Sequence, residues 1–398
     1  MIKEIAGGVA VPHGFRADGV SCGIKKNGKD LAIISSEVKA RAAALFTTNK
    51  LQAAPLKITQ KHLRNGIAQA VIINSGNANS ATGEEGLRDA RKMAKLTAVK
   101  LGIKESDVLV SSTGIIGKKL PMDKIKAGIE KLLPRGGING SRKVAEAIMT
   151  TDTLPKEVAV TIKVGGEKIT VGAVAKGAGM VSPHLATMLS FITTDALITP
   201  AALSYVLRKS VETSFNMITI DGDMSTNDMV VILANGLAGN KEITMKDLVK
   251  FQDAITFVTS SLAKMIVKNA EGATKFVTVK VKNAPNLNAA KMASLAIAKS
   301  NLVKAALYGC DPNWGRIISA LGSSGININS KKIDIYIGGV IVAQNGVMTE
   351  FNSQMVKKKM TQRTFTILVD IKIGNEEATA WTCDLSEDYV RINSSYST

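Results

Sequence analysis

The stretch KEVAVTIKVGGEKITVGAVAK, residues 156–176, indicates the fold class. It holds two strand-like segments, residues 156–164 and 167–176, which are joined at Gly165-Gly166. A glycine pair between two such segments is typical of a tight β-hairpin. Because a hairpin pairs its strands antiparallel, a purely parallel sheet with alternating helices does not fit this chain. We therefore expect an α+β fold in which helices cover a sheet with antiparallel strands.

Strand-like and helix-like periodicities alternate along the rest of the chain. The segment AQAVIINSG (68–76) predicts a buried strand that enters a glycine- and asparagine-containing loop, and DVLVSSTG (107–114) predicts another that ends in a polar loop. Further strands are predicted at 188–198, 274–282, 332–343 and 365–374, and helices at 84–102, 121–133, 200–214, 244–268 and 286–300. We find no repeat of solenoid length and no low-complexity linker between these elements.

The composition is that of a soluble globular protein. The chain has 398 residues, of which 45% are apolar and 21% charged, enough for one large or two ordinary domains. No window holds about 18 consecutive apolar residues, and residues 1–15 lack the apolar segment of a secretion signal, so we expect neither a membrane span nor export. Cys22, Cys310 and Cys383 are widely spaced and odd in number, which suits free thiols in the cytoplasm and gives no metal-ligand spacing.

The formal net charge of +18 first suggests a nucleic-acid or other anionic ligand. The excess of basic residues is scattered singly along the chain, apart from short runs such as KKK at 357–359. Aromatic residues make up only 4% of the chain, so platforms on which single-stranded bases stack are scarce. We therefore expect a solvated, lysine-rich surface and no nucleic-acid partner.

The stretch KGAGMVSPHLATMLSF (176–191) places Thr187 between a glycine- and proline-containing approach and an apolar, strand-like run. A hydroxyl becomes a nucleophile only beside a base, and the chain has only three histidines. If the Thr187 hydroxyl attacks the carbonyl of Ala186 and the ester then hydrolyses, the freed α-amine has a pKa of about 8. That amine can serve as the base for the hydroxyl of its own residue. The alternative interpretation is a threonine that begins a strand and has no chemical role.

Motifs in a fixed order cover nearly the whole chain, and they favour the catalytic interpretation of Thr187. They are DLAIISS (30–36), LFTTNKLQAAP (45–55), INSGNANSATGEEG (73–86), SSTGIIGKKLP (111–121), MTTDTLPK (149–156), AKGAGMVSPHLATMLSFITTDA (175–196), ITIDGDMSTND (218–228), EGATKF (271–276), CDPNWGRI (310–317) and DYVRINSSYST (388–398). Together they resemble the glutamate/ornithine N-acetyltransferases of arginine biosynthesis. Residues 175–196 are similar to the segment at which those enzymes cut themselves.

The resemblance implies a fold and a subunit organisation. The fold is a four-layer α/β/β/α sandwich, of the type found in ornithine acetyltransferases and self-cleaving aminopeptidases, with a smaller C-terminal α/β region at about 285–398. Cleavage between Ala186 and Thr187 would give an alpha chain of residues 1–186 and a beta chain of residues 187–398. The two chains are expected to stay associated and to form a heterotetramer.

The resemblance also implies the reaction. An acetyl group moves from N-acetylornithine to Thr187 and then to glutamate, in ping-pong order. Thr113 and Gly114 match the family's oxyanion donors, which each tetrahedral intermediate requires. The positions that match substrate-binding residues are Thr153, Lys176, Thr187, Glu271, Asn393 and Thr398. No metal or nucleotide cofactor is implied, and acetyl-CoA as a further acetyl donor stays open.

The residues by themselves leave alternatives open. Thr150 and Thr151 offer the same hydroxyl group as Thr153. His184 stands where the family has asparagine, and we interpret it as a loop histidine in preference to a second base. Lys176 is also compatible with a solvated loop.

Two further motifs have competing interpretations. Asp221, Asp223, Asn227 and Asp228 offer four oxygen ligands, but they lack the spacing of an EF-hand loop, so we expect capping and turn bonding. Cys310 has no histidine nearby in the sequence and is not expected to be catalytic.

Two rival functions are a self-cleaving aminopeptidase, which releases its product to water, and a basic nucleic-acid-binding protein, which stays uncut.

Overall fold

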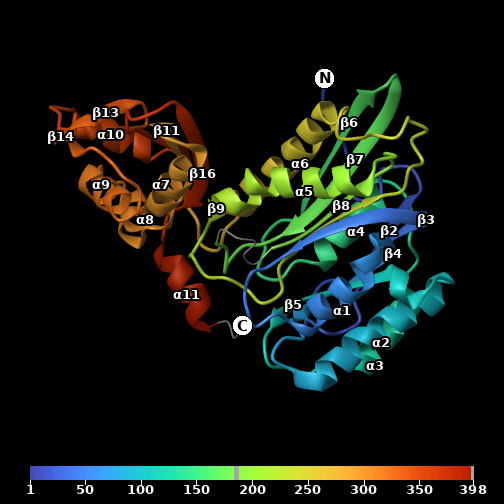
Figure 1. The fold of residues 1–398 in the computed structure, drawn as a ribbon. Helices are drawn as coiled ribbons and strands as arrows, with labels where there is room; N and C mark the ends of the chain where they lie inside the picture. The colour runs from blue at the N-terminus through green and yellow to red at the C-terminus, as the bar shows by residue number, and fades with distance from the viewer. Residues whose placement is uncertain (183–187, 396–398) are drawn as a thin grey trace.

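The structure is a computed structural model that describes residues 1–182 and 188–395. These residues form an α+β fold with two sheets, one of nine strands and one of seven (Figure 1). The smaller sheet and its helices lie at one end of the molecule, and the C-terminal helix runs back from there toward the larger sheet (Figure 1). The α+β class predicted from the hairpin is confirmed.

The nine-stranded sheet mixes parallel and antiparallel pairs. Its strands lie in the order β1-β6-β7-β8-β10-β3-β4-β5, and β2 also pairs with β3. The β6–β7 hairpin has the predicted bounds, and both glycines of its turn have positive φ, +61° and +95°, as a type I′ turn requires. The bounds of the strands are β1 (Lys3–Ile5), β2 (Phe15–Val20), β3 (Leu31–Phe46), β4 (Ile67–Asn77), β5 (Val108–Ile115), β6 (Lys156–Val164), β7 (Glu167–Lys176), β8 (Leu189–Thr194) and β10 (Met229–Ala234).

The large sheet folds over a layer of apolar side chains. Val71 of β4 belongs to the same buried cluster as Phe191 of β8 and Val231 of β10. The inner faces of the two halves of the sheet, β6-β7-β8-β10 and β3-β4-β5, therefore pack on each other. β3 spans 16 residues and pairs with strands of both halves, and its register against β4 shifts between Ser35 and Ala40. A register shift of this kind bends a strand and increases its twist.

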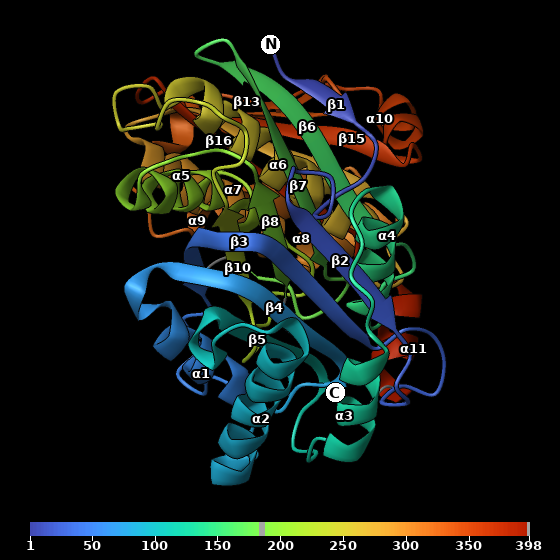
Figure 2. The same cartoon turned by 90° about the vertical axis from the view of Figure 1, so that its right-hand side faces the viewer.

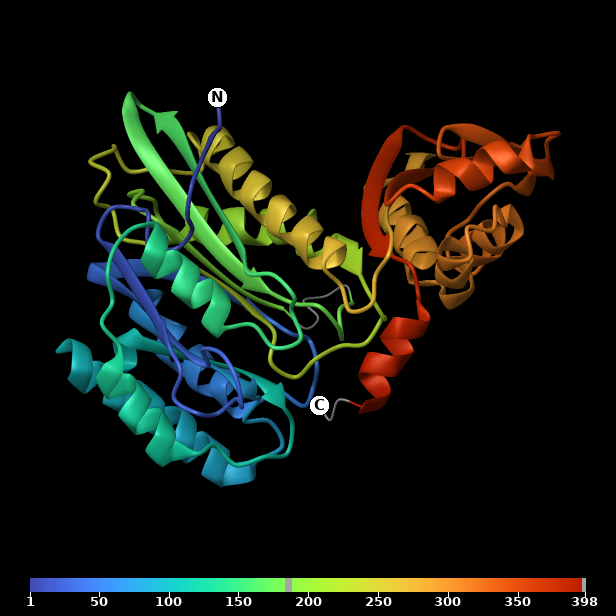
Figure 3. The same cartoon turned by 180° about the vertical axis from the view of Figure 1, so that it is seen from behind.

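Helices cover the outer faces of both halves, which gives the order α/β/β/α (Figure 2 and Figure 3). On one side lie α5 (Pro200–Glu212) and α6 (Val249–Lys268), and on the other α1 (Ala54–His62), α2 (Gly83–Leu101) and α3 (Met122–Lys131), while α4 (Ile138–Ala147) packs on β2. The α5 helix begins where Thr199 caps it with its side chain ahead of Pro200. In the part of the chain that the structure describes, no helix is both long and apolar enough to cross a membrane.

The seven-stranded sheet has the order β14-β13-β12-β15-β11-β16-β9. Its strands are β9 (Ile218–Thr219), β11 (Phe276–Ala284), β12 (Asp334–Ile337), β13 (Val340–Gln344), β14 (Val347–Met348), β15 (Thr364–Asp370) and β16 (Glu376–Cys383). The helices of this region are α7 (Leu287–Lys299), α8 (Asn301–Tyr308), α9 (Trp314–Gly322) and α10 (Ser353–Met360), and α11 (Glu387–Ser395) follows β16. Short 3₁₀ turns are formed by Leu63–Asn65, Glu105–Asp107, Phe215–Met217 and Ser330–Lys332.

The structure corrects one predicted strand and shortens three other elements by four residues or more. Residues 332–343 were expected to form one strand but form the hairpin β12–β13, because Gly338 and Gly339 both have positive φ, +57° and +85°, and reverse the chain. The helix expected at 244–268 begins only at Val249. The strands expected at 188–198 and 365–374 end at Thr194 and Asp370.

Within the large sheet, two strands that follow residue 187 are inserted between strands that precede it. β8 and β10 follow residue 187 in the chain, and they lie between β7 and β3, which precede it. β8 pairs antiparallel with β7, and β10 pairs antiparallel with β3. A break in the chain at residue 187 therefore leaves the hydrogen bonds of the sheet in place.

The apolar layer inside the folded sheet predicts a stability effect. Phe191→Ala removes a fully buried ring from this layer, so we expect the free energy of unfolding to fall by about 3–5 kcal/mol in denaturant titrations. Val99→Ala is the matched control, because Val99 is 75% exposed on α2, and its effect should stay within about 0.5 kcal/mol. Equal stability of the two variants would contradict this account of the core.

Candidate active site

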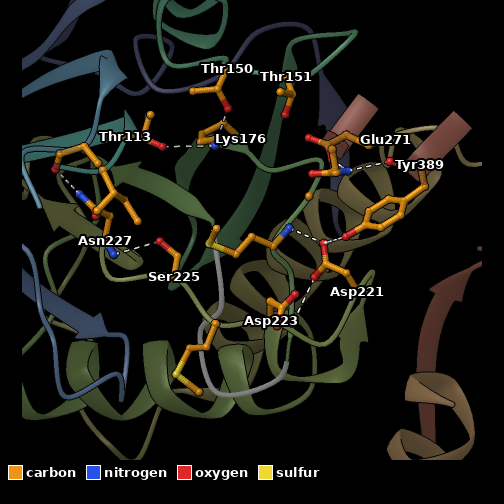
Figure 4. A pocket seen from close by; sticks show the side chains of 17 residues that line it. Thr113, Thr150, Thr151, Lys176, Asp221, Asp223, Ser225, Asn227, Glu271 and Tyr389 are labelled. Carbon is orange, nitrogen blue, oxygen red and sulfur yellow. Dashed lines mark hydrogen bonds between the residues drawn. The ribbon is translucent and has the colours of Figure 1, made fainter. Parts of the chain in front are cut away.

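A cavity of about 470 Å³ lies where the ends of β5 and β7 meet α11 and the loop after α6 (Figure 4). A volume of this size suits a small metabolite. The residues that line it are Ala78, Thr113, Gly114, Ile116, Thr150, Thr151, Lys176, Gly179, Met180, Asp221, Asp223, Met224, Ser225, Asn227, Glu271, Tyr389 and Asn393.

Lys176, the last residue of β7, supplies a buried ammonium group on one side of the cavity. Its Nζ donates to Thr150 Oγ1 at 2.9 Å and to Thr113 Oγ1 at 3.3 Å (Figure 4). Burial lowers the pKa of Lys176, and the carboxylates of Asp152 and Asp228 oppose that effect. The lysine thus links two hydroxyls from different parts of the chain.

Gly114 stands at the end of β5, where the strand approaches β4 too closely for a side chain. Its φ is +129°, and a Cβ atom there would lie 2.3 Å from the carbonyl carbon of Gly76 and 2.5 Å from the backbone nitrogen of Asn77. A position of this kind admits only glycine. The Thr113-Gly114 backbone is thereby brought against β4 at the edge of the cavity.

Carboxylates and their hydrogen-bond partners form the opposite side of the cavity (Figure 4). Asn393 Nδ2 donates to Glu271 Oε2 at 2.9 Å, and Tyr389 Oη donates to Asp221 Oδ2 at 3.1 Å. Burial raises the pKa of Asp221, and burial together with Asp221 raises the pKa of Tyr389. The cavity therefore presents a cation at one end and carboxylates at the other, which suits an amino acid.

The loop that contains Asp221 is held by turn hydrogen bonds. Asp221 accepts from the backbone nitrogens of Met180, Val181 and Asp223, as expected for turn bonding. Within residues 1–182 and 188–395, no group of three or more His, Cys, Asp or Glu side chains could hold a metal ion.

A second set of hydrogen bonds fixes the same loop to β5. Asn227 Nδ2 donates to the carbonyl oxygens of Ala78 and Ser112 at 2.6 and 2.8 Å. Because Ser112 immediately precedes Thr113, these bonds fix the loop against the end of β5.

The structure brings five of the residues chosen from the sequence to this cavity and leaves one outside it. The five are Thr113, Gly114, Lys176, Glu271 and Asn393. Thr153 is exposed and does not line the cavity, whereas Thr150 and Thr151 do, because Asp152 turns the chain between them. Cys310 does not line it either, and its Sγ lies 3.5 Å from the carbonyl oxygen of Met360. Ala186, Thr187, His184 and Thr398 lie outside the described residues.

Sequence reasoning missed the parts played by Tyr389 and Asp152. Both stand inside quoted motifs, DYVRINSSYST and MTTDTLPK, but neither residue type in those patterns indicates a contact partner. Tyr389 meets Asp221 across 168 positions of the chain. A pairing between segments this far apart leaves no local signal in the sequence.

The chain is similar to known proteins along its full length. Residues 16–398 match the model of the ArgJ family. The chain is 47% identical to the arginine biosynthesis bifunctional protein ArgJ of Symbiobacterium thermophilum over the whole of both chains, and 47% identical to the protein of that name from Thermotoga neapolitana over 98% of this chain and all of that one. A solved structure of ornithine acetyltransferase from Mycobacterium tuberculosis, complexed with ornithine, is 42% identical over 46% of this chain and 98% of its own, with a TM-score of 0.44.

The anchoring of α11 by polar contacts gives a testable expectation. No residue of α11 is fully buried, and only Tyr389 of this helix packs against the apolar core, so hydrogen bonds contribute much of its anchoring. Tyr389→Phe removes the bond to Asp221, and we expect backbone amides of residues 387–395 to exchange with solvent about tenfold faster, measured by hydrogen–deuterium exchange. Arg391→Ala is the control, because it removes only an exposed ion pair with Asp388. Unchanged exchange in Tyr389→Phe would show that this bond does not hold the helix.

Proposed function

The chain belongs to the ArgJ family, and we propose that it catalyses acetyl transfer through an acetyl group carried on Thr187. The chain is an ornithine acetyltransferase of arginine biosynthesis. The proposal rests on the cavity, because it brings Thr113 and Gly114, the buried Lys176 and the carboxylates of Asp221 and Glu271 together in one small space.

Each half of the reaction is an acyl transfer. The Thr187 α-amine takes the proton of the Thr187 hydroxyl, whose oxygen attacks the acetyl carbonyl carbon of N-acetylornithine. The tetrahedral intermediate collapses as its C–N bond breaks, and the leaving nitrogen takes the proton, which releases ornithine. The amine of glutamate then attacks the acetyl ester and gives up a proton to the Thr187 α-amine. The C–O bond to Thr187 breaks, and the Thr187 oxygen takes that proton as it leaves. The products are ornithine and N-acetylglutamate.

Thr113 and Gly114 are the donors proposed for the oxyanion of both intermediates. Lys176 Nζ donates to Thr113 Oγ1, so the hydroxyl accepts from a cation and its own hydrogen is available to the cavity. A hydroxyl polarised in this way is a stronger donor to a developing negative charge. The close approach of Gly114 to β4 fixes the position of the Thr113-Gly114 backbone before substrate binds.

Thr187 stands two residues before Leu189 in the chain, and the register partner of Leu189 on β7 is Lys176. This pairing supports a nucleophile at the cavity and cleavage between Ala186 and Thr187. In that step the Thr187 oxygen attacks the Ala186 carbonyl, and its proton passes to the Thr187 nitrogen as the peptide C–N bond breaks, which frees the α-amine. Water then hydrolyses the resulting ester and releases the Ala186 carboxylate and the Thr187 hydroxyl. The alpha chain of residues 1–186 and the beta chain of residues 187–398 then remain joined by the β7–β8 and β10–β3 pairs. Two such pairs are proposed to form a heterotetramer.

The two ends of the cavity suit the two charged ends of an amino-acid substrate. The Lys176 ammonium, with the hydroxyls of Thr150 and Thr151, suits a substrate carboxylate, and the Glu271 carboxylate suits a substrate amine. Asn393 orients Glu271 by its hydrogen bond. Thr398, the last residue, is proposed to close the cavity with the tail that follows α11.

A second acetyl donor is proposed as well. Two relatives that are 47% identical to this chain are named bifunctional proteins. That name favours acetyl-CoA as a second acetyl donor to glutamate, in addition to N-acetylornithine. All three cysteines are free thiols in the structure, which supports a cytoplasmic location.

Thr187→Ala tests the nucleophile and the cut together. The wild type should consist of two chains, the second beginning with Thr187, and the variant should be one uncut chain by intact-mass analysis and N-terminal sequencing. Acetyl transfer to glutamate from either donor should fall to background in the variant. Thr213→Ala is the matched control, because Thr213 follows α5, is exposed and lies outside the cavity lining, so it should cut and react as the wild type does.

The outcomes of this experiment separate the proposals. Robust transfer by Thr187→Ala, or an active wild type that is never cut, would rule out the Thr187 mechanism. Wild-type transfer from N-acetylornithine but not from acetyl-CoA would remove only the second donor.

Thr113→Val tests the oxyanion donor, since it keeps the shape of the side chain and removes the hydroxyl. We expect kcat for acetyl transfer to fall by about 100- to 1000-fold. Thr161→Val on β6 is the control, because Thr161 is buried to a similar degree but lies outside the cavity lining, and its kcat should stay close to wild type. A near-normal kcat in a folded Thr113→Val enzyme would dismiss the assignment.

A further inference from the structure

Asp152 lies beside the cavity without lining it, and its side chain is fully buried. Its Oδ1 accepts from Lys156 Nζ at 2.6 Å and from the backbone nitrogen of Gly177 at 2.8 Å, and its Oδ2 accepts from the backbone nitrogen of Thr150 at 3.1 Å. A buried carboxylate with this many partners is fixed in position. The acceptor bonds therefore tie together three separate points of the chain.

Two of those three points belong to the cavity side of the molecule. Gly177 is the residue after Lys176, so its bond to Asp152 fixes the end of β7 from which the lysine projects. Thr150 offers its hydroxyl to Lys176 Nζ, while its backbone is bound to Asp152. Asp152 thus holds both the donor and the acceptor of the Lys176–Thr150 hydrogen bond.

The same carboxylate supplies negative charge near the Lys176 ammonium. Burial raises the pKa of Asp152, but Lys156, Lys176 and the hydrogen bonds outweigh this effect and hold it at about 2. The charged groups that face Lys176 are Asp152, Asp228, Glu271, Lys156 and Lys25. Among the groups that raise the pKa of Lys176, Asp152 has the largest effect.

We infer that Asp152 is a positioning residue for acetyl transfer, which holds Lys176 and Thr150 in the arrangement that the substrate and the Thr113 hydroxyl require. The inference rests on the proposed function. The competing interpretation is purely structural, with Asp152 present only to pair with the buried Lys156.

The sign of the electrostatic effect follows from the geometry. Asp152 stabilises the protonated form of Lys176, so removal of its charge lowers the pKa of the lysine. The ammonium is then lost at a lower pH, and the alkaline limb of the pH profile that depends on it moves to lower pH. A purely structural role gives no such movement once the fold is intact.

The test compares Lys156→Met with the double variant Asp152→Asn/Lys156→Met. Both lack Lys156, and they differ only in the charge and hydrogen bonding of residue 152. The double variant leaves no buried charge of this pair, and replacing both partners of a buried pair is often neutral for stability, whereas removing one is not. Thermal melting and intact mass check the fold and the chain cut of each protein.

In Lys156→Met, Asp152 keeps its bonds to the backbone nitrogens of Thr150 and Gly177, so we expect this variant to be less stable but to retain acetyl transfer. We expect the double variant to lose about 100-fold in kcat, as a displaced reacting group does. The alkaline limb should move down by about one pH unit or more in the double variant relative to Lys156→Met. A double variant with the kcat and pH profile of Lys156→Met would overturn the inference and leave the structural role. Asp152→Glu is the second test if either protein fails to fold. It keeps the charge and moves the oxygens, so we expect an unshifted limb with reduced kcat, and full kcat would equally overturn the inference.

A readout that needs no turnover separates this inference from the proposed function. NMR titration of lysine labelled at Cε reports the pKa of Lys176 directly, and a lower value in the double variant than in Lys156→Met supports the inference even if acetyl transfer is absent from the wild type. An inactive wild type would reject the proposed function, and equal Lys176 titrations would reject the electrostatic part of the inference.

Discussion

The antiparallel pairing of β7 with β8 is the constraint on which the rest of the molecule depends. It sets Lys176, the last residue of β7, opposite Leu189, the first residue of β8. It also inserts strands from the second half of the chain between strands of the first half. One set of backbone hydrogen bonds therefore fixes the cavity lysine, supports the proposed cleavage point and joins the two halves. Because such bonds do not depend on an unbroken chain, the proposed cut leaves the fold intact.

The large sheet folds over on itself. Its inner faces share one apolar cluster, and its outer faces are covered by separate groups of helices. The ends of β5 and β7, which lie in different halves of the sheet, are thereby brought to the same cavity. Burial there shifts pKa values and strengthens charge interactions. The polar residues of the cavity accordingly occur in bonded sets, such as Lys176 with Thr113 and Thr150, or Tyr389 with Asp221.

Local features could be predicted closely from the sequence, and features that depend on distant contacts could not. The bounds of the β6–β7 hairpin follow from its Gly165-Gly166 turn, which is a property of two adjacent residues. The segment 332–343 contains a similar glycine pair, Gly338-Gly339, but its strand-like residues on both sides favoured one strand. In the first hairpin two long strands flank the turn, whereas the second has only short ones, so the periodicity there was too brief to show the reversal.

The sequence by itself determined the α+β class, the ordered motifs and five of the residues that line the cavity. The tertiary structure decided that Thr150 and Thr151, and not Thr153, line the cavity, because a buried Asp152 fixes the turn of the chain between them. It also placed Asp152 against Gly177. The physical reason is the same in each case: residue type and spacing set the local conformation and chemistry, but the partner of a buried polar group is chosen by packing between segments far apart in the chain.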